Sequence, residues 1–325
     1  MARKKIVLIG CGNIGSRHLQ AAAKLPFPCT VQVVEPNETS QELAKSRLAD
    51  VAYDRNAHDF HWHKSIQDLK GKSDLTIVAT SAAGRGAVIS DLVNSGHSRF
   101  LIEKMVCQSE AEYRSLLSTI EASEGKAWVN TPRRYYKSYL RIREHFHNQP
   151  IHLSVVAGNE GLGSNAIHFL DLFSWFSGDY KAKLGGDFLF DKLFPNKRGP
   201  DFLEFAGYIT GASPNGSSLN ISFFPFDEHI PLTVSIVSRD THVVINETNA
   251  KIFNLAPKNH PLGEDFQNEF VSDTTTQIAS DIISKDECLL ASLEDSFVAH
   301  SELFRIFNAH IEKLTGEKKE LCPIT

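Results

Sequence analysis

The first third of the chain alternates between short apolar runs and longer segments of helical composition. The runs are mostly apolar at successive positions, as in strands that helices cover on both faces; they fall at residues 6–9, 31–35, 73–79, 99–103 and 127–130. The segments between them, such as 14–24 and 110–123, are rich in good helix formers. Alternation at this spacing predicts a parallel, doubly wound sheet.

After about residue 125 the pattern changes. A strongly apolar helix is expected at 165–176, and an amphipathic helix at 292–314. Between them several strands follow one another from 205 to 254, with Gly, Pro and Asn in their turns. This order predicts an α+β domain with a mostly antiparallel, open sheet. Because 325 residues exceed the usual size of one core, we expect two domains, at 1–125 and 126–325.

Charge and cysteine usage exclude several classes of protein. The formal net charge is −5 with no long run of one sign, so neither nucleic acid nor a membrane surface is an expected partner. The run at 6–9 is too short for a signal peptide, and no stretch is long enough to span a bilayer. The five cysteines are far apart and odd in number, which favours a reducing cytoplasm.

A Gly-rich sequence joins the first predicted strand to the first predicted helix. Gly10, Gly12 and Gly15 have GxGxxG spacing, and Asn13 and Ile14 lie between the last two. The first Gly permits a tight turn, the second lets a pyrophosphate approach the backbone, and the third lets helix and strand pack closely. The pyrophosphate then lies at a helix N-terminus, which favours an anion. These five residues predict a dinucleotide-binding Rossmann domain; the alternative is a turn with incidental glycines.

Glu35 strengthens this prediction and selects the cofactor. It lies 20 residues after Gly15, at the end of the second predicted strand. A carboxylate there accepts hydrogen bonds from ribose hydroxyls and repels a 2′-phosphate. We therefore expect NAD rather than NADP.

Two other features have simpler interpretations than chemistry. Cys11, within the Gly-rich loop, is interpreted as a small residue that packs well there. His58, His61 and His63 cluster around Trp62, but a metal ion would need oriented ligands and a closing fourth group. A strand with exposed imidazoles is the preferred interpretation, and no metal site is expected.

At Glu103-Lys104 a second motif appears. Together with residues 10–19, GCGNIGSRHL, it resembles the Gfo/Idh/MocA family of sugar and polyol oxidoreductases. Family members have Ala-Thr after the fourth strand and Glu-Lys-Pro after the fifth; here these places hold Ala79-Thr80 and Glu103-Lys104-Met105. The resemblance covers nearly the whole chain. It implies that Ala79, Thr80, Ser81, Glu103 and Lys104 contact the cofactor.

Further segments resemble the family in the second domain. They are Asn130 with residues 133–135, and His168-x-x-Asp171 with Trp175 and Gly178. The chain also resembles a subgroup of the family that is often linked to bacterial surface-polysaccharide or nonulosonic-acid biosynthesis. This resemblance is found at residues 196–199, at Glu204 and at residues 322–325.

The resemblance implies a specific chemistry. Oxidising a sugar hydroxyl requires removal of its proton as hydride leaves the carbon, so the base must reach that hydroxyl. Lys104 would bond the reacting oxygen, and His168 would be the acid and base. The implied activity is NAD-dependent hydride transfer at a hydroxyl or keto carbon of a sugar or sugar derivative.

The chain departs from the family beside both residues. Many members have Asp four residues before the His, where this chain has Ser164, and Met105 replaces the Pro after Lys104. A hydroxyl cannot stabilise an imidazolium as a carboxylate does. Asp171 is an alternative partner for His168. Two other functions therefore stay open: a catalytically inactive, NAD-binding regulatory or sensor protein, and a reductase of a non-sugar carbonyl or imine.

Basic residues near the domain junction suggest an anionic substrate, because the guanidinium fork suits carboxylates. The candidates for substrate contact are Arg133, Arg134, Ser164, Asn165, Asp171 and Lys197. The alternative for the basic residues is solvated surface charge. The open sheet of the second domain predicts a homodimer or homotetramer.

Overall fold

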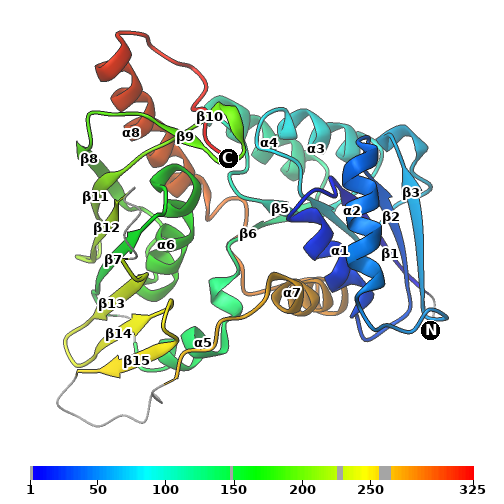
Figure 1. The fold of residues 1–325 in the computed structure, drawn as a ribbon, viewed down its shortest axis with the longest axis horizontal. Helices are drawn as coiled ribbons and strands as arrows, with labels where there is room; N and C mark the ends of the chain where they lie inside the picture. The colour runs from blue at the N-terminus through cyan, green and yellow to red at the C-terminus, as the bar shows by residue number, and fades with distance from the viewer. Residues whose placement is uncertain (1–2, 147–148, 225–229, 256–264) are drawn as a thin grey trace. The chain divides into compact units, whose positions relative to one another are not determined.

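The structure, a computed structural model, describes residues 3–146, 149–224, 230–255 and 265–325. It divides into two compact units, each with its own large sheet (Figure 1). The first unit comprises Met1–Cys107, Ala111–Tyr135 and Glu269–Glu294. The second unit comprises Gln108–Glu110, Tyr136–Asn268 and Asp295–Thr325.

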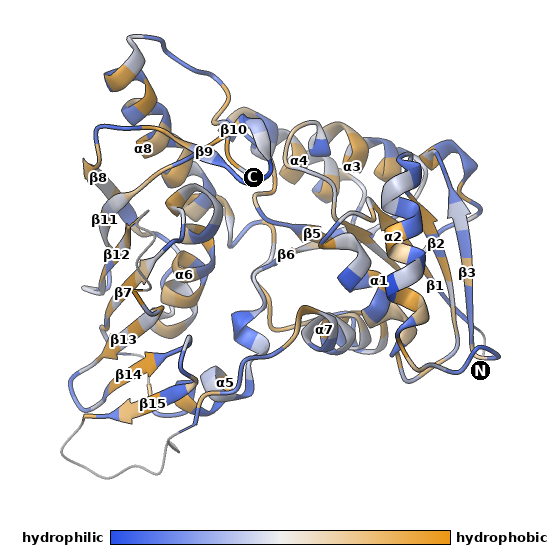
Figure 2. Ribbon diagram, viewed as in Figure 1, coloured by the Kyte–Doolittle hydropathy of each residue, from blue (hydrophilic) through white to orange (hydrophobic). Residues whose placement is uncertain are grey.

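The first unit contains a six-stranded parallel sheet in the order β3-β2-β1-β4-β5-β6. Its strands are β1 (Lys4–Ile9), β2 (Cys29–Val34), β3 (His58–His63), β4 (Leu75–Val78), β5 (Arg99–Glu103) and β6 (Lys126–Asn130). Ile6, Val7 and Leu8 of the central strand are all at most 1% exposed, as expected for a strand covered on both faces. In Figure 2 β1 and β2 are hydrophobic, whereas β3 at the sheet edge is paler.

Helices connect these strands and cover the sheet. They are α1 (Gly15–Ala23), α2 (Glu38–Ala49), α3 (Arg85–Asn94), α4 (Glu110–Ala122) and α7 (Val271–Lys285), with 3-10 turns η1 (Ile66–Asp68) and η2 (Pro132–Tyr135). Helix α7 comes late in the sequence but lies beside α1 (Figure 1), and the Thr276 hydroxyl donates to the Ala21 carbonyl at 3.0 Å.

The division into units differs from the single boundary after residue 125 that the sequence suggests. Strand β6 continues the first sheet because it pairs with β5, so the first unit extends to Tyr135. Residues 290–293 pair in turn with the free edge of β6, through bonds such as Val129 N–H to the Ala291 carbonyl at 3.0 Å. The sequence pattern did not predict α7, which adds a C-terminal segment to the N-terminal unit.

The second unit contains a seven-stranded sheet in the order β15-β14-β13-β7-β12-β11-β8. The pair β7–β12 is parallel, and the other pairs are antiparallel. The strands of this unit are β7 (His152–Gly158), β8 (Lys183–Leu189), β9 (Phe194–Asn196), β10 (Gly199–Glu204), β11 (Gly207–Ala212), β12 (Ser218–Phe224), β13 (Thr233–Val237), β14 (His242–Asn246) and β15 (Lys251–Asn254). Strands β9 and β10 form a separate hairpin.

Three helices complete the second unit: α5 (Lys137–Arg143), α6 (Leu162–Ser177) and α8 (Phe297–Thr315). Helix α6 packs against α8 and β12, and α8 packs against β8. Alternate residues of the sheet are buried, such as Leu153 and Val155 in β7, as expected when helices cover one face.

The predicted fold class is confirmed, with a doubly wound parallel sheet in one unit and a mostly antiparallel sheet with helices in the other. The sequence pattern did not predict strands β8, β9 and β10. Within the described part of the chain, no helix combines the length and the apolar character needed to cross a membrane.

Candidate functional site

The Gly-rich turn between β1 and α1 has the backbone geometry that its spacing predicts. Gly10 has a φ of +81°, a conformation that L residues rarely adopt. A Cβ at Gly15 would lie 2.1 Å from the Gly10 carbonyl oxygen, so only glycine fits there. A Cβ at Gly12 would meet nothing within 4 Å. The backbone at Gly12 therefore borders open space at the start of α1, as a bound pyrophosphate requires.

Glu35 is held in place beside this turn. Its Oε2 accepts a hydrogen bond from the Cys11 N–H at 2.7 Å, and its Oε1 accepts one from the Asn37 N–H at 2.9 Å. These bonds connect the end of β2 to the loop after β1. A carboxylate has about four acceptor positions, so Glu35 can still accept bonds from ribose hydroxyls.

A pocket of about 530 Å³ lies next to Glu35 within the first unit. It is lined by Ile9, Gly10, Gly12, Val34, Glu35, Pro36, Lys64, Ser65, Ile66, Gln67, Ala79, Thr80, Ser81 and Val88. Six of the residues expected from the sequence to bind the cofactor are therefore in one cavity. Residues 64–67, which follow β3, were not anticipated. The open space at Gly12 and the acceptor at Glu35 fit the diphosphate and ribose of a dinucleotide.

Arg47 on α2 supports the turn from its outer side. Its guanidinium donates to the Ser16 hydroxyl at 2.6 Å and to the Asn13 side-chain oxygen at 3.2 Å. It thus links α2 to the residues that open α1. The sequence analysis missed Arg47, because nothing in the local pattern connects it to a loop 34 residues earlier.

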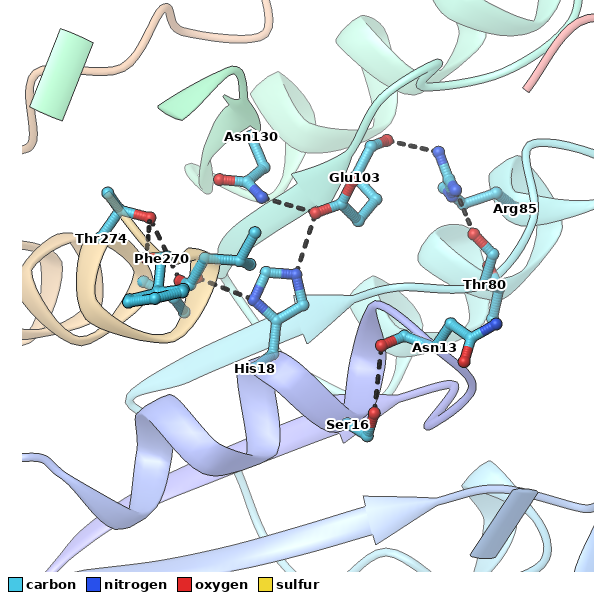
Figure 3. Close-up of polar contacts among 11 residues, drawn as sticks. Asn13, Ser16, His18, Thr80, Arg85, Glu103, Asn130, Phe270 and Thr274 are labelled. Atoms are coloured by element: carbon cyan, nitrogen blue, oxygen red, sulfur yellow. Dashed lines mark hydrogen bonds and ion pairs between the residues drawn. The ribbon is translucent and has the colours of Figure 1, made fainter. Parts of the chain in front are cut away.

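The ends of β4 and β5 are joined by Arg85, whose side chain is only 1% exposed. Its guanidinium donates to the backbone carbonyls of Thr80 and Glu103 (Figure 3), and also to that of Met105. Lys104 lies between two of these carbonyls and is only 6% exposed. The Lys104–Met105 peptide bond is cis. Arg85 therefore fixes the backbone on both sides of Lys104.

Glu103 belongs to a buried polar cluster, with His18 and Asn130 both pointing toward its carboxylate (Figure 3). His18 Nε2 lies 2.9 Å from Glu103 Oε1, and Asn130 Nδ2 donates to the same oxygen at 2.5 Å. Because a carboxylate only accepts, His18 donates from Nε2. His18 Nδ1 lies 3.0 Å from the Thr275 hydroxyl of α7. The cluster thus joins α1, β5, β6 and α7.

The cluster holds Glu103 in its ionised form. Burial by itself would raise the pKa of this carboxyl group. The hydrogen bond and charge of His18, the hydrogen bond from Asn130 and the charge of Lys104 outweigh burial and lower the pKa of Glu103 to about 2. His18 was not among the predicted site residues, although it lies within residues 10–19, which carry part of the family resemblance.

In the second unit, His168 lies on α6, one turn after Ser164. The Ser164 hydroxyl donates to Glu204 Oε2 at 2.5 Å, and Asn196 Nδ2 lies 3.1 Å from the Ser164 oxygen. The backbone N–H groups of Gly163 and Ser164 both donate to Glu204 Oε1, the second at 3.2 Å. A carboxylate from β10 therefore sits at the N-terminus of α6, a partner that sequence reasoning did not assign.

The other predicted substrate residues are distributed over both units. Asp171 is buried on α6, and Asn165 donates from Nδ2 to Glu160 Oε2 at 2.6 Å. Arg133 and Arg134 lie in η2 of the first unit, where the buried Arg134 donates to the Leu289 carbonyl at 3.2 Å. Lys197 is exposed between β9 and β10 of the second unit.

Cys11 lies in the core, and the three clustered histidines lie on a strand. Burial, then the charge of Glu35, raises the pKa of the Cys11 thiol to about 12. His58, His61 and His63 lie on strand β3 as predicted, but only His61 is exposed: His63 is half-buried and His58 is buried. Across the described residues, no three His, Cys, Asp or Glu side chains gather as a metal ion would need.

Residues 4–131 match the model of a family described as "Oxidoreductase family, NAD-binding Rossmann fold" (GFO_IDH_MocA). This description agrees with the expected cofactor, NAD. A search of curated protein sequences gives no match.

Several solved structures have a similar fold at low sequence identity. An oxidoreductase from Agrobacterium radiobacter, solved with NAD+, L-tartaric acid and magnesium, has a TM-score of 0.73 and 12% identity over 97% of this chain and 98% of its own. UDP-N-acetylglucosamine 3-dehydrogenase GnnA from Acidithiobacillus ferrooxidans has a TM-score of 0.71 and 15% identity over 97% and 99%. The WlbA dehydrogenase from Bordetella pertussis, solved with NADH and UDP-GlcNAcA, has a TM-score of 0.68 and 12% identity over 96% of both chains.

Proposed function

Because residues 4–131 match the model of the Gfo/Idh/MocA oxidoreductase family, we propose that this chain is a member of that family and transfers hydride between NAD and a hydroxyl or keto carbon of a sugar or sugar derivative. The observation that carries the proposal is the backbone support of Lys104. Arg85 binds the carbonyls before and after Lys104, and also that of Thr80 in the dinucleotide pocket. The backbone at Lys104, a residue that is only 6% exposed, is thereby fixed at the same sheet edge as the Gly-rich turn.

The first unit supplies the cofactor site. Gly12 gives the diphosphate access to the start of α1, Glu35 accepts bonds from the ribose hydroxyls, and Arg47 holds Asn13 and Ser16 in position. NAD, when bound, supplies the acceptor or donor of the hydride.

Lys104 and His168 carry the proton chemistry in this proposal. Lys104 donates a hydrogen bond to the reacting oxygen, which polarises a keto carbon or lowers the cost of ionising a hydroxyl. In oxidation His168 accepts the hydroxyl proton as the hydride leaves the carbon. In reduction the same group returns the proton to the oxygen.

The substrate is proposed to be a sugar derivative, with an anionic group as one option. Two similar structures are described as dehydrogenases of UDP-sugars or were solved with one, and another was solved with L-tartaric acid. Arg133, Arg134 and Lys197 are the candidates for binding a carboxylate or phosphate. UDP-N-acetylglucosamine, its uronic acid and L-tartrate are therefore the first compounds to test.

The test is hydride transfer, followed by the absorbance of reduced nicotinamide. We expect the wild-type protein to reduce NAD+ with at least one of these compounds, and Lys104→Met to lose turnover by roughly a hundredfold or more while NAD affinity is kept. Lys181→Met, at an exposed position, is the control and should keep full activity. Equal turnover of the two variants would contradict the role of Lys104.

One observation favours the second candidate, a catalytically inactive NAD-binding regulator. Position 164 carries a hydroxyl where many family members carry a carboxylate. A protein that binds NAD tightly but transfers no hydride with a broad set of sugars, sugar acids and nucleotide sugars would support this candidate. Turnover that depends on both Lys104 and His168 would exclude it.

We also propose that the chain forms a homodimer or homotetramer through the sheet of the second unit. Helices α6 and α8 cover one face of this sheet, and the opposite face carries half-buried residues such as Val156 in β7. Light scattering after size exclusion should give a multiple of the 36.2 kDa chain mass, and Val156→Glu should shift it toward the monomer. A wild-type monomer at all concentrations would contradict this assembly.

A further inference from the structure

Glu204 reaches the start of α6 from a distant part of the chain. It is the last residue of β10, and its carboxylate accepts hydrogen bonds from the Gly163 and Ser164 N–H groups and from the Ser164 hydroxyl. Glycines make this approach possible. A Cβ at Gly161 would lie 1.9 Å from Glu204 Cδ, and one at Gly163 would lie 2.7 Å from Glu204 Oε1.

The position of this carboxylate relates it to His168. Ser164 and His168 are both within α6 and four residues apart, so their side chains emerge on one face, roughly 6 Å apart at Cβ. The Glu204 carboxylate accepts a hydrogen bond from the Ser164 hydroxyl and therefore lies at the helix face that also carries His168, one turn before it. Asn196 also donates to Glu204 Oε2, at 3.3 Å, which further fixes the carboxylate.

We propose that Glu204 is a positioning residue for His168, and that it supplies through Ser164 the negative charge that an Asp at position 164 would supply. This inference rests on the proposed role of His168 as acid and base. In this proposal the negative charge near His168 is retained although position 164 holds Ser. Glu204 of β10 carries the charge, and the Ser164 hydroxyl donates a hydrogen bond to its carboxylate.

Other charged groups lie on α6 and on the elements packed against it. Asp171 lies on α6 itself, β12 carries no titratable side chain, and β10 also carries Asp201, which is exposed. On α8, His300 bonds to Ser296, Glu302 accepts from the Leu184 N–H and pairs with Arg305, His310 lies near the Phe190 carbonyl, and Lys313 pairs with Asp191. These groups and Lys104 of the first unit are the same in wild type and Glu204 variants, so their effects cancel.

The experiment measures the protonation of His168 directly. The protein is labelled with 13C in its histidine rings, and His168→Asn assigns the resonance. A carboxylate stabilises an imidazolium, so we expect the pKa of His168 to be lower by roughly 0.3 to 1.7 units in Glu204→Gln, for a charge separation of about 7 to 10 Å and an effective dielectric between about 20 and 80. Gln keeps the size of Glu and one acceptor oxygen, which can still accept from the Gly163 and Ser164 N–H groups, and it removes the charge.

A second variant separates charge from helix support. Ser164→Asp in the Glu204→Gln background returns a carboxylate one turn before His168, and should bring the His168 pKa back toward the wild-type value. If Glu204→Gln does not fold, the double variant still tests the idea. An unchanged pKa in a folded Glu204→Gln protein, or no return in the folded double variant, would overturn the inference.

Turnover adds a readout that distinguishes this inference from the proposed function. With an active substrate, the acid limb of the kcat profile should move to lower pH in Glu204→Gln, by the same amount as the His168 pKa. If the pKa moves and the kcat profile does not, the electrostatic coupling holds and the role of His168 as base fails.

Discussion

The buried charge of Glu103 gives a prediction whose size follows from the structure. The surroundings lower the pKa of this carboxyl group from 4.5 to about 2. A group with a lowered pKa in the folded state stabilises the protein above its unfolded pKa, and this stability is lost as pH falls through its folded pKa. Glu103→Gln removes the charge and keeps the shape and an acceptor oxygen, so the variant lacks this pH-dependent stability.

The magnitude comes from the difference between the two pKa values. A separation of about 2.5 units corresponds to about 3 kcal/mol at pH 6 and to about 2 kcal/mol near pH 3.5, where part of the effect has been lost. The free energy of unfolding of wild type minus that of Glu103→Gln should follow these values. The difference must therefore shrink as the solution becomes more acidic.

Urea denaturation followed by circular dichroism, across this pH range, provides the measurement. Glu42→Gln is the matched control, because Glu42 forms an exposed pair with Lys45 on α2, and we expect a change within about 0.5 kcal/mol. A difference below about 1 kcal/mol for Glu103→Gln at pH 6 would refute the reasoning. So would a difference that stays constant or grows as pH falls.

Four further predictions concern the cofactor turn and its neighbours. Gly12→Ala should keep wild-type thermal stability and lose NAD affinity by roughly tenfold or more, which calorimetry of NAD binding would measure. Gly15→Ala should lower the free energy of unfolding by at least about 2 kcal/mol, because its Cβ would overlap the Gly10 carbonyl, and calorimetry of unfolding would measure this loss. Glu35→Gln should weaken NAD binding by roughly tenfold and reduce the preference for NAD over NADP, as fluorescence titration of both reduced cofactors would reveal; an unchanged ratio would contradict its role. Cys11, with its pKa raised to about 12, should react with iodoacetamide at neutral pH far more slowly than free cysteine, as mass spectrometry of the modified peptide would test.

Local patterns in the sequence were sufficient for much of the first unit. The strand, the glycines and Glu35 lie within 35 residues, and each has a local physical requirement that restricts the residue type. The Gly15 position is an example, because the close contact with the Gly10 carbonyl follows from the turn itself.

The parts that escaped prediction depend on contacts between distant residues. Helix α7 contains several Thr residues, which have low helix propensity, and it is stabilised by packing Thr275, Ile278 and Ile282 inward. His18 meets Glu103 across 85 positions, and Ser164 meets Glu204 across 40. A single sequence contains no local signal for such pairs. The boundary between the units could not be predicted from local patterns for the same reason, because α7 comes late in the sequence and packs in the first unit.

The central claim is that this chain transfers hydride at a sugar carbon with Lys104 and His168 as the reacting groups. The most direct test is single-turnover reduction of NAD+ with UDP-N-acetylglucosamine, its uronic acid and L-tartrate, in wild type, Lys104→Met and His168→Asn. The account predicts formation of reduced nicotinamide with at least one compound in wild type, and its loss in both variants although NAD still binds. Hydride transfer that persists in either variant, or that is absent from wild type with every sugar derivative, would contradict it.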